Sequence, residues 1–325
     1  MISRRNIRVK VMQTLYTVTV VEHDGKNPVA SEGKEPAAKT VLDPDRATKL
    51  LFQHFDQTRS LLVYLLYYLT ELARYAQTDA HQRAGKHLPT TSDLHVNTKI
   101  VSNEWLRKME EDPALQKQFA KEKPQRFADK ELLRRIYHQL EETPEYITYT
   151  RQENRERSEE KNIIEFILND LMLANEAFVA HIEENFVNWD DDGDMLVQLL
   201  AGYIQKPGSI QFNAMLSADK QEFARSLLVT VMEKGEQLQS LIIPKLKNWD
   251  PERIALLDMI MMKMGVAEFL FFETIPPKVT INEYIDLAKE YSTTQSGQFV
   301  NGILDNIHKD LVQQGKMQKI GYKKA

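Results

Sequence analysis

The sequence predicts an all-α protein, and three observations indicate this class. Glycine and proline number only 12 each in 325 residues, which is sparse for this length. The apolar segments are long and are interrupted by charged residues rather than by turn signals, a pattern typical of helices. The longest uninterrupted apolar run, Leu61 to Leu69, fits a buried helix and is far shorter than the ~20 residues that a membrane-spanning helix needs.

The first helix is expected to begin at Ser3, a suitable N-cap, and to end near Glu22. Four apolar residues recur at helical spacing and form one strip for packing: Ile7, Val11, Leu15 and Val18. A neighbouring strip carries Arg5 and Tyr16, with Arg8 three residues after Arg5. Cationic and aromatic side chains therefore share one part of the predicted helix surface.

The middle of the chain alternates linkers with predicted helices. Glycine and proline among small and charged residues indicate an exposed linker at 24–45, and polar residues indicate a loop at 78–98. The helices predicted in this part, several of them separated by prolines, are 45–77, 102–111, 113–122, 126–141 and a helical stretch at 145–187.

The C-terminal part has the most regular pattern. Asp250 is expected to cap a helix that continues to Phe272 and is nearly apolar on all sides, as in a central helix surrounded by others. A capping box at 280–283 predicts the start of the next helix. A last helix is predicted over 298–312.

Charge is unevenly distributed along the chain. The net charge is −5, yet residues 1–22 carry four cations against one acid and residues 309–325 carry five against one, which leaves −12 for the rest. A basic surface on an acidic body indicates local attraction to phosphate. The absence of cysteine excludes disulfides and thiolate chemistry, and it is consistent with a cytoplasmic location.

No group of residues supports catalysis, a cofactor or a metal, so we predict a protein that is not an enzyme. The eight histidines form no recognisable ligand spacing, and no phosphate-binding glycine loop is present. Residues 188–193 partly fit an EF-hand loop, but Leu199 stands where a bidentate glutamate is needed, so calcium binding is a weaker alternative. Export through a twin-arginine signal is also a weaker alternative, because Arg8 and Lys10 interrupt the apolar region that should follow such a signal.

Three stretches of the sequence together resemble one known family. They are Val279-Thr280-Ile281-Asn282-Glu283 with Ile285-Asp286-Leu287-Ala288-Lys289, then Phe299-Val300-Asn301-Gly302-Ile303-Leu304-Asp305, and Arg4-Arg5-Asn6-Ile7-Arg8 with Gln13-Thr14-Leu15-Tyr16. The first two are similar to the C-terminal signature of the NusB family, and the third resembles its arginine-rich opening. The resemblance covers 1–22 and 165–312. It implies a NusB-like helical bundle, enlarged by an inserted linker and helical region at 23–164 and followed by a basic tail at 313–325.

The resemblance implies a transcription antitermination factor. In this family the protein pairs with NusE, a small-subunit ribosomal protein, and the pair binds the boxA element of nascent RNA and supports read-through by RNA polymerase in ribosomal RNA operons. Carried over by position, the expected RNA-binding residues are Arg4, Arg5, Arg8, Lys10, Tyr16 and Phe299. The expected partner-binding residues are Glu252 and Asn301. Asn6 and Gln298 replace an arginine and a lysine of the family pattern, which suggests a weaker or shifted electrostatic contact.

The residue types fit this role, because a reader of single-stranded RNA needs cations for phosphates and flat side chains for unstacked bases. One alternative is that the arginines are only a solvated helix face and the aromatic residues belong to the core. Another is a helical protein-interaction scaffold whose insertion binds a different partner. A methyltransferase that carries a NusB-like domain is not expected, since the signature ends near the C-terminus. No membrane partner is predicted, and the oligomeric state is left open, a homodimer included.

Overall fold

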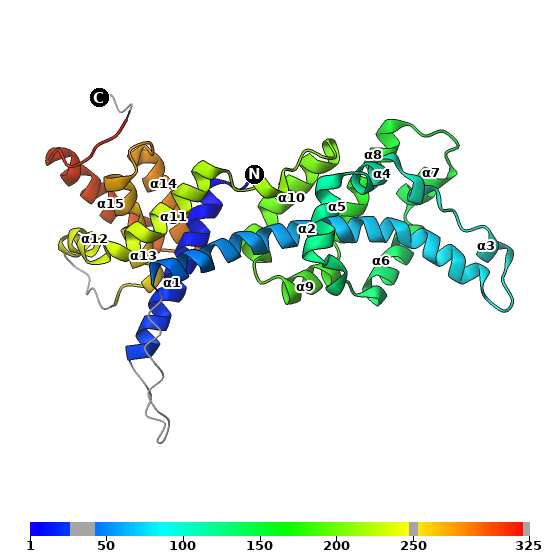
Figure 1. The fold of residues 1–325 in the computed structure, drawn as a ribbon, viewed down its shortest axis with the longest axis horizontal. Coiled ribbons are helices and arrows are strands. Elements are labelled where there is room, and N and C mark those ends of the chain that lie inside the picture. The colour runs from blue at the N-terminus through cyan, green and yellow to red at the C-terminus, as the bar shows by residue number, and fades with distance from the viewer. Residues whose placement is uncertain (27–42, 247–252, 321–325) are drawn as a thin grey trace, which may run out of the picture. The chain divides into compact units, whose positions relative to one another are not determined.

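The computed structural model describes residues 1–26, 43–246 and 253–320, and these residues form helices and no strand (Figure 1). The predicted all-α class is confirmed. The chain divides into two compact units. Unit 1 comprises Met1–Ile2 and Phe55–Leu216, and unit 2 comprises Ser3–His54 and Ser217–Ala325.

Unit 2 is built around one apolar helix. Its elements are α1 (Arg4–Lys26), the first turns of α2 (Pro44–Ala84), α11 (Ala218–Glu233), α12 (Gly235–Ile242), α13 (Leu256–Phe271), α14 (Pro277–Tyr291) and α15 (Ser296–Gln313). Helix α13 contacts α1, α11, α12, α14 and α15, so the prediction of a central helix is confirmed. It begins at Leu256, and the expected cap Asp250 lies outside the described residues.

The start of α1 agrees with the sequence, whereas the start of α14 does not. The Ser3 hydroxyl accepts a hydrogen bond from the backbone N–H of Asn6 at 3.1 Å, and the four residues of the predicted apolar strip are buried. The capping box predicted at 280–283 is wrong, because α14 already begins at Pro277. Proline suits the first position of a helix, where its missing N–H is not needed.

Unit 1 contains shorter helices arranged along the rest of α2. They are α3 (Thr91–Leu94), α4 (Glu104–Glu110), α5 (Pro113–Glu122), α6 (Lys130–Glu142), α7 (Pro144–Arg151), α8 (Arg157–Phe166), α9 (Glu176–Asn185) and α10 (Trp189–Gln205). The predicted long helix is confirmed and extends to Ala84, with nearly all of Leu61 to Leu69 buried. The predicted helical stretch at 145–187 is divided into α7, α8, a π-helical turn and α9.

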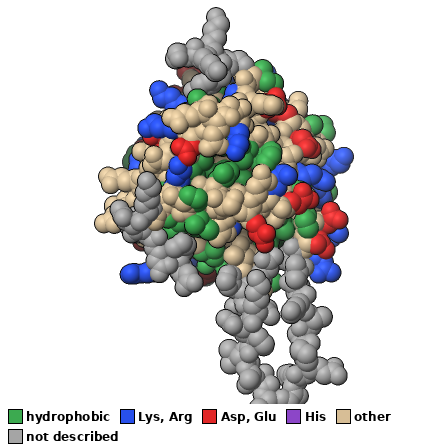
Figure 2. Space-filling model, turned by 90° about the vertical axis from the view of Figure 1, so that its left-hand side faces the viewer, with side chains coloured by type: hydrophobic (Ala, Val, Ile, Leu, Met, Phe, Trp, Pro, Cys, Tyr) green, Lys and Arg blue, Asp and Glu red, His purple; other side chains and the backbone are tan. Residues whose placement is uncertain are grey.

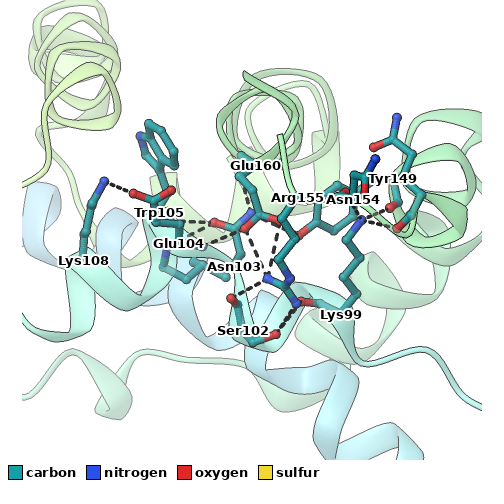
Figure 3. A network of polar contacts seen from close by, with 12 residues as sticks. Lys99, Ser102, Asn103, Glu104, Trp105, Lys108, Tyr149, Asn154, Arg155 and Glu160 are labelled. Atoms are coloured by element: carbon teal, nitrogen blue, oxygen red, sulfur yellow. Dashed lines mark hydrogen bonds and ion pairs between the residues drawn. The ribbon is translucent and has the colours of Figure 1, made fainter. Parts of the chain in front are cut away.

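A polar network closes the loop between α7 and α8 (Figure 3). The Lys99 ammonium donates to the carbonyl oxygens of Tyr149 at 2.7 Å and Gln152 at 2.8 Å, at the end of α7. The buried Glu160 carboxylate accepts from the Tyr149 hydroxyl at 2.9 Å and from the backbone N–H of Glu104 at 2.8 Å. These bonds pair polar groups that would be costly to leave unsatisfied.

The residues that partly fit an EF-hand loop form the start of a helix instead. Asp190, Asp191 and Asp192 lie in the first turn of α10, and the Asp192 carboxylate accepts hydrogen bonds from Thr58 and Asn188, each at 2.7 Å. Within the described ranges no three acidic or histidine side chains are grouped to hold a metal ion. No described helix is long and apolar enough to cross a membrane.

Candidate nucleic-acid interface

Two arginines lie on the surface at the beginning of α1. Arg4 is exposed, and its guanidinium lies 5.4 Å from the centre of the Phe223 ring. Arg5 donates from Nη2 to Glu290 Oε2 at 2.7 Å, and its side chain remains 40% exposed. Exposed ion pairs of this kind contribute only about 0–1 kcal/mol, so a phosphate group can compete for the Arg5 guanidinium.

Arg8, by contrast, is inside unit 2. Its side chain is 3% exposed, and Nε donates to Glu268 Oε1 at 2.7 Å while Nη2 donates to Glu268 Oε2 at 3.1 Å. Glu283 approaches Nη1 at 3.2 Å. Burial by itself would lower the pKa of Arg8, but the facing carboxylate of Glu268 outweighs it and raises this pKa above its ordinary value. This burial corrects the expectation that Arg8 lies on the cationic surface.

Glu268 is the centre of a buried polar cluster. Besides the two bonds from Arg8, its carboxylate accepts one from the Thr280 hydroxyl at 2.8 Å and one from the Tyr284 hydroxyl at 2.9 Å. Burial and the adjacent carboxylate raise the pKa of Tyr284, which keeps its hydroxyl protonated as a donor. The cluster therefore joins α1, α13 and α14 through a fully satisfied charge.

Two further residues predicted on α1 have different positions. Lys10 is 3% exposed, so it does not offer an exposed ammonium as expected. Tyr16 is 43% exposed and keeps a flat side chain on the surface of the helix. The exposed part of the predicted RNA-binding set on α1 is thus Arg4, Arg5 and Tyr16.

Phe299 lies at a second location in unit 2, a cavity of about 660 Å³. The polar residues that line this cavity include Lys245, Arg253, Asp258, Gln298 and Asn306. The buried Asp258 accepts a hydrogen bond from Ser296 at 2.8 Å, whereas its other oxygen has no hydrogen-bond partner among the described residues. Figure 2 shows one face of unit 2, with hydrophobic side chains gathered near the middle of the face and charged ones around them.

The end of α14 connects these two locations. Glu290 holds Arg5 of α1, and the neighbouring Lys289 packs against Gly297 at the start of α15 so closely that a Cβ on Gly297 would lie 2.7 Å from Lys289 Cγ. Phe299 follows two residues later. The end of α14 therefore contacts both the beginning of α1, through Arg5, and the start of α15, at Gly297.

Of the two predicted partner-binding residues, the structure describes only Asn301. Asn301 is exposed on α15, and the adjacent Gly302 lines the cavity. A Cβ at Gly302 would meet no atom within 4 Å, so close packing does not explain this glycine. Glu252 lies outside the described residues.

The sequence did not indicate Lys245, Arg253 or Asp258 as part of a site. None of the three is part of a recognisable motif, and only folding brings them to one cavity with residues of α15. The basic C-terminal stretch is also less free than its charge suggests. Lys319 donates to the carbonyl oxygens of Glu268 at 2.8 Å and Phe272 at 2.7 Å, and burial lowers its pKa to about 8.

Comparison with known proteins relates the C-terminal part of the chain to one family. The model of the NusB family matches residues 190–309. Proteins named transcription antitermination protein NusB are similar as well. The one from Salinibacter ruber is 41% identical over 100 residues, which are 31% of this chain and 62% of that protein. The one from Methylacidiphilum infernorum is 40% identical over 99 residues, which are 30% of this chain and 68% of that protein.

A third relative, from Chloroherpeton thalassium, is 33% identical over 114 residues, which are 35% of this chain and 54% of that protein. The chain thus spans less than two thirds of the first two relatives. The matched segment begins in α10, includes all of α11 to α14 and ends inside α15, and it contains the residues that line the cavity with Phe299.

Proposed function

Because the chain belongs to the NusB family, we propose that it is a transcription antitermination factor that binds nascent RNA. The RNA-binding surface is formed by Arg4, Arg5 and Tyr16 of α1 and by Phe299 of α15. The exposed cations attract phosphates, and the aromatic rings offer faces on which unstacked bases can stack. This function requires no enzymatic step, and it operates where RNA is transcribed, in the cytoplasm.

One observation carries the proposal. Helix α1 lies outside the segment that the family model matches, yet it belongs to the same compact unit as α11 to α15. The buried bonds between Arg8 of α1 and Glu268 of α13 fix it there. The arginine-rich first helix is therefore a part of the NusB-like unit, which supports its role in RNA binding.

The finer assignment concerns the RNA and the partner. We propose that the RNA is boxA-like, that NusE binds beside it, and that the complex supports read-through in ribosomal RNA operons. Asn301 and the rim of the cavity at Gly302 are offered as the NusE surface, since both are exposed. The cation Arg253 and the unpartnered oxygen of Asp258 supply charge of both signs for such a contact, whereas the Lys245 ammonium is paired with Asp310.

The experiment compares the RNA affinity of the full chain with that of Arg4→Ala/Arg5→Ala, with and without NusE, over a series of salt concentrations. Removing two phosphate contacts should reduce the magnitude of the salt slope by about 1.4, at about 0.7 per contact on single strands. The matched control is Arg46→Ala/Lys49→Ala, which removes two exposed cations from α2. An unchanged slope and affinity in the α1 variant would exclude this RNA surface.

A further inference from the structure

Charge is strongly separated within unit 1. Residues 113–135 carry seven cations and three acids, whereas residues 136–194 carry four cations and 16 acids. The first group coincides with α5, the turn that follows it and the start of α6. A net positive segment on an otherwise acidic unit produces a local field that attracts anions.

Two of the three acids of this segment, Glu122 and Asp129, are engaged in internal bonds. Glu122 accepts from the Ser60 hydroxyl at 2.7 Å and from Arg59 Nε at 3.2 Å. Asp129 caps α6 by accepting from the backbone N–H groups of Glu131 at 2.8 Å and Leu132 at 3.1 Å. Their charges are therefore used for structure rather than for neutralising the neighbouring cations.

The cations, in contrast, face solvent. We call five of them the basic corner: Lys117, Lys121, Lys123, Arg126 and Lys130, all exposed. Only Lys121 approaches a carboxylate among the described residues, that of Glu122 at 3.7 Å. Lys123 ends α5 in the left-handed conformation, with φ 51°, and the chain turns through residues 124–126 into α6. This turn places four cations within ten residues around one bend.

Two aromatic side chains lie among these cations and remain half-buried. The ring of Phe127 has the Arg126 guanidinium at 4.6 Å from its centre, and Phe119 packs edge-on against Tyr67 with 5.6 Å between ring centres. Cations interleaved with partly exposed rings are the combination that sequence-tolerant binding of single-stranded nucleic acid uses. An acidic protein partner would need the cations alone.

We propose that the basic corner is a second RNA-binding surface, which holds single-stranded RNA by its phosphates with little preference for sequence. The proposal rests on the proposed function in one respect, that the chain meets RNA. It assigns to the insertion a role separate from that of α1 and Phe299, namely to hold RNA other than the boxA-like element.

The test measures binding of poly(U) and of a short boxA-like RNA to the full chain and to Lys117→Glu/Arg126→Glu/Lys130→Glu. Loss of about three phosphate contacts should reduce the magnitude of the salt slope for poly(U) by about 2 and weaken binding at low salt by about tenfold or more. The control Arg107→Glu/Arg151→Glu/Lys206→Glu changes the net charge equally at exposed positions of unit 1 outside the corner. It should weaken binding much less.

Lysine acylation of the wild-type chain gives a second readout, which does not depend on whether a variant folds. Poly(U) should protect Lys117, Lys123 and Lys130 from the reagent and leave Lys206 reactive. Equal poly(U) affinity and slope in the corner and control variants, or no protection of the corner lysines, overturns the proposal. A failure of the proposed function gives a different result: the affinity of Arg4→Ala/Arg5→Ala for the boxA-like RNA would equal that of the wild-type chain, independently of the results for the basic corner variant.

Discussion

At the scale of single residues, the buried carboxylate of Glu268 decides which arginines of α1 can meet a ligand. It takes two hydrogen bonds from Arg8, so this guanidinium is committed to the interior. Arg5 has its acidic partners at the surface, where water and salt weaken the attraction. One arginine therefore stabilises the unit, and the other remains accessible to phosphate.

Arg8→Ala should lower the free energy of unfolding by about 3–5 kcal/mol, because it leaves the charge of Glu268 buried and without its cation. Arg5→Ala should cost less than about 1 kcal/mol, since its ion pair is exposed. Urea unfolding of both variants measures the difference. Similar losses for the two variants would mean that Arg8 is not held as the structure shows.

Sequence spacing could not separate these two arginines. The periodicity of α1 correctly predicts its buried apolar strip, and it places Arg5, Arg8 and Tyr16 on neighbouring parts of the helix surface. The residue that draws Arg8 inward lies 260 positions further along the chain. A local pattern contains no information about a partner at that separation, so the burial of Arg8 becomes visible only in the fold.

At the scale of helices, glycines play opposite roles in α13 and α15. A Cβ on Gly265 of α13 would lie 2.9 Å from Leu304 Cδ2 and 3.0 Å from Leu304 Cδ1, so this glycine permits the two helices to approach. Gly302 of α15 has open space around it. The first glycine serves packing, and the second leaves the rim of the cavity uncovered.

Gly265→Ala should destabilise the chain by about 1–3 kcal/mol through overpacking against Leu304. Gly302→Ala should stabilise it by about 0.5–1 kcal/mol, because alanine favours the helix and meets no neighbour. Thermal or urea unfolding of the two variants measures whether each substitution lowers or raises the free energy of unfolding. If Gly302→Ala stabilises the chain but weakens NusE binding, the glycine is retained for partner contact, and destabilisation by this variant would contradict the open space around it.

Helices were easier to predict than their ends. The central apolar helix, the proline-separated helices of unit 1 and the last helix all follow from hydrophobic period and prolines, which are local signals. The residues at 280–283 have the sequence of a capping box, yet Thr280 lies inside α14, and its hydroxyl donates a hydrogen bond to Glu268 of α13. A tertiary hydrogen bond thus uses the side chain that local rules assign to capping.

At the scale of the whole molecule, the family model matches the C-terminal part of the predicted resemblance, and the resemblance of residues 1–22 stays a prediction. Unit 2 combines residues 3–54 with 217–325, whereas unit 1 continues to Leu216 and so includes part of the matched segment. The proposed domain boundaries at 22/23 and 164/165 stay a prediction. Tyr16 and Phe299 were predicted by position in the family, while the cavity was not, because residues from separate stretches assemble it.

We propose above all that this enlarged NusB family member binds boxA-like RNA together with NusE. Fluorescence anisotropy of labelled RNA, titrated with the full chain in the presence of NusE, tests it most directly. We expect a boxA-like RNA to bind about tenfold or more tighter than a scrambled RNA of equal length, a difference of about 1.4 kcal/mol or more. Equal affinities for the two RNAs, with and without NusE, would contradict it.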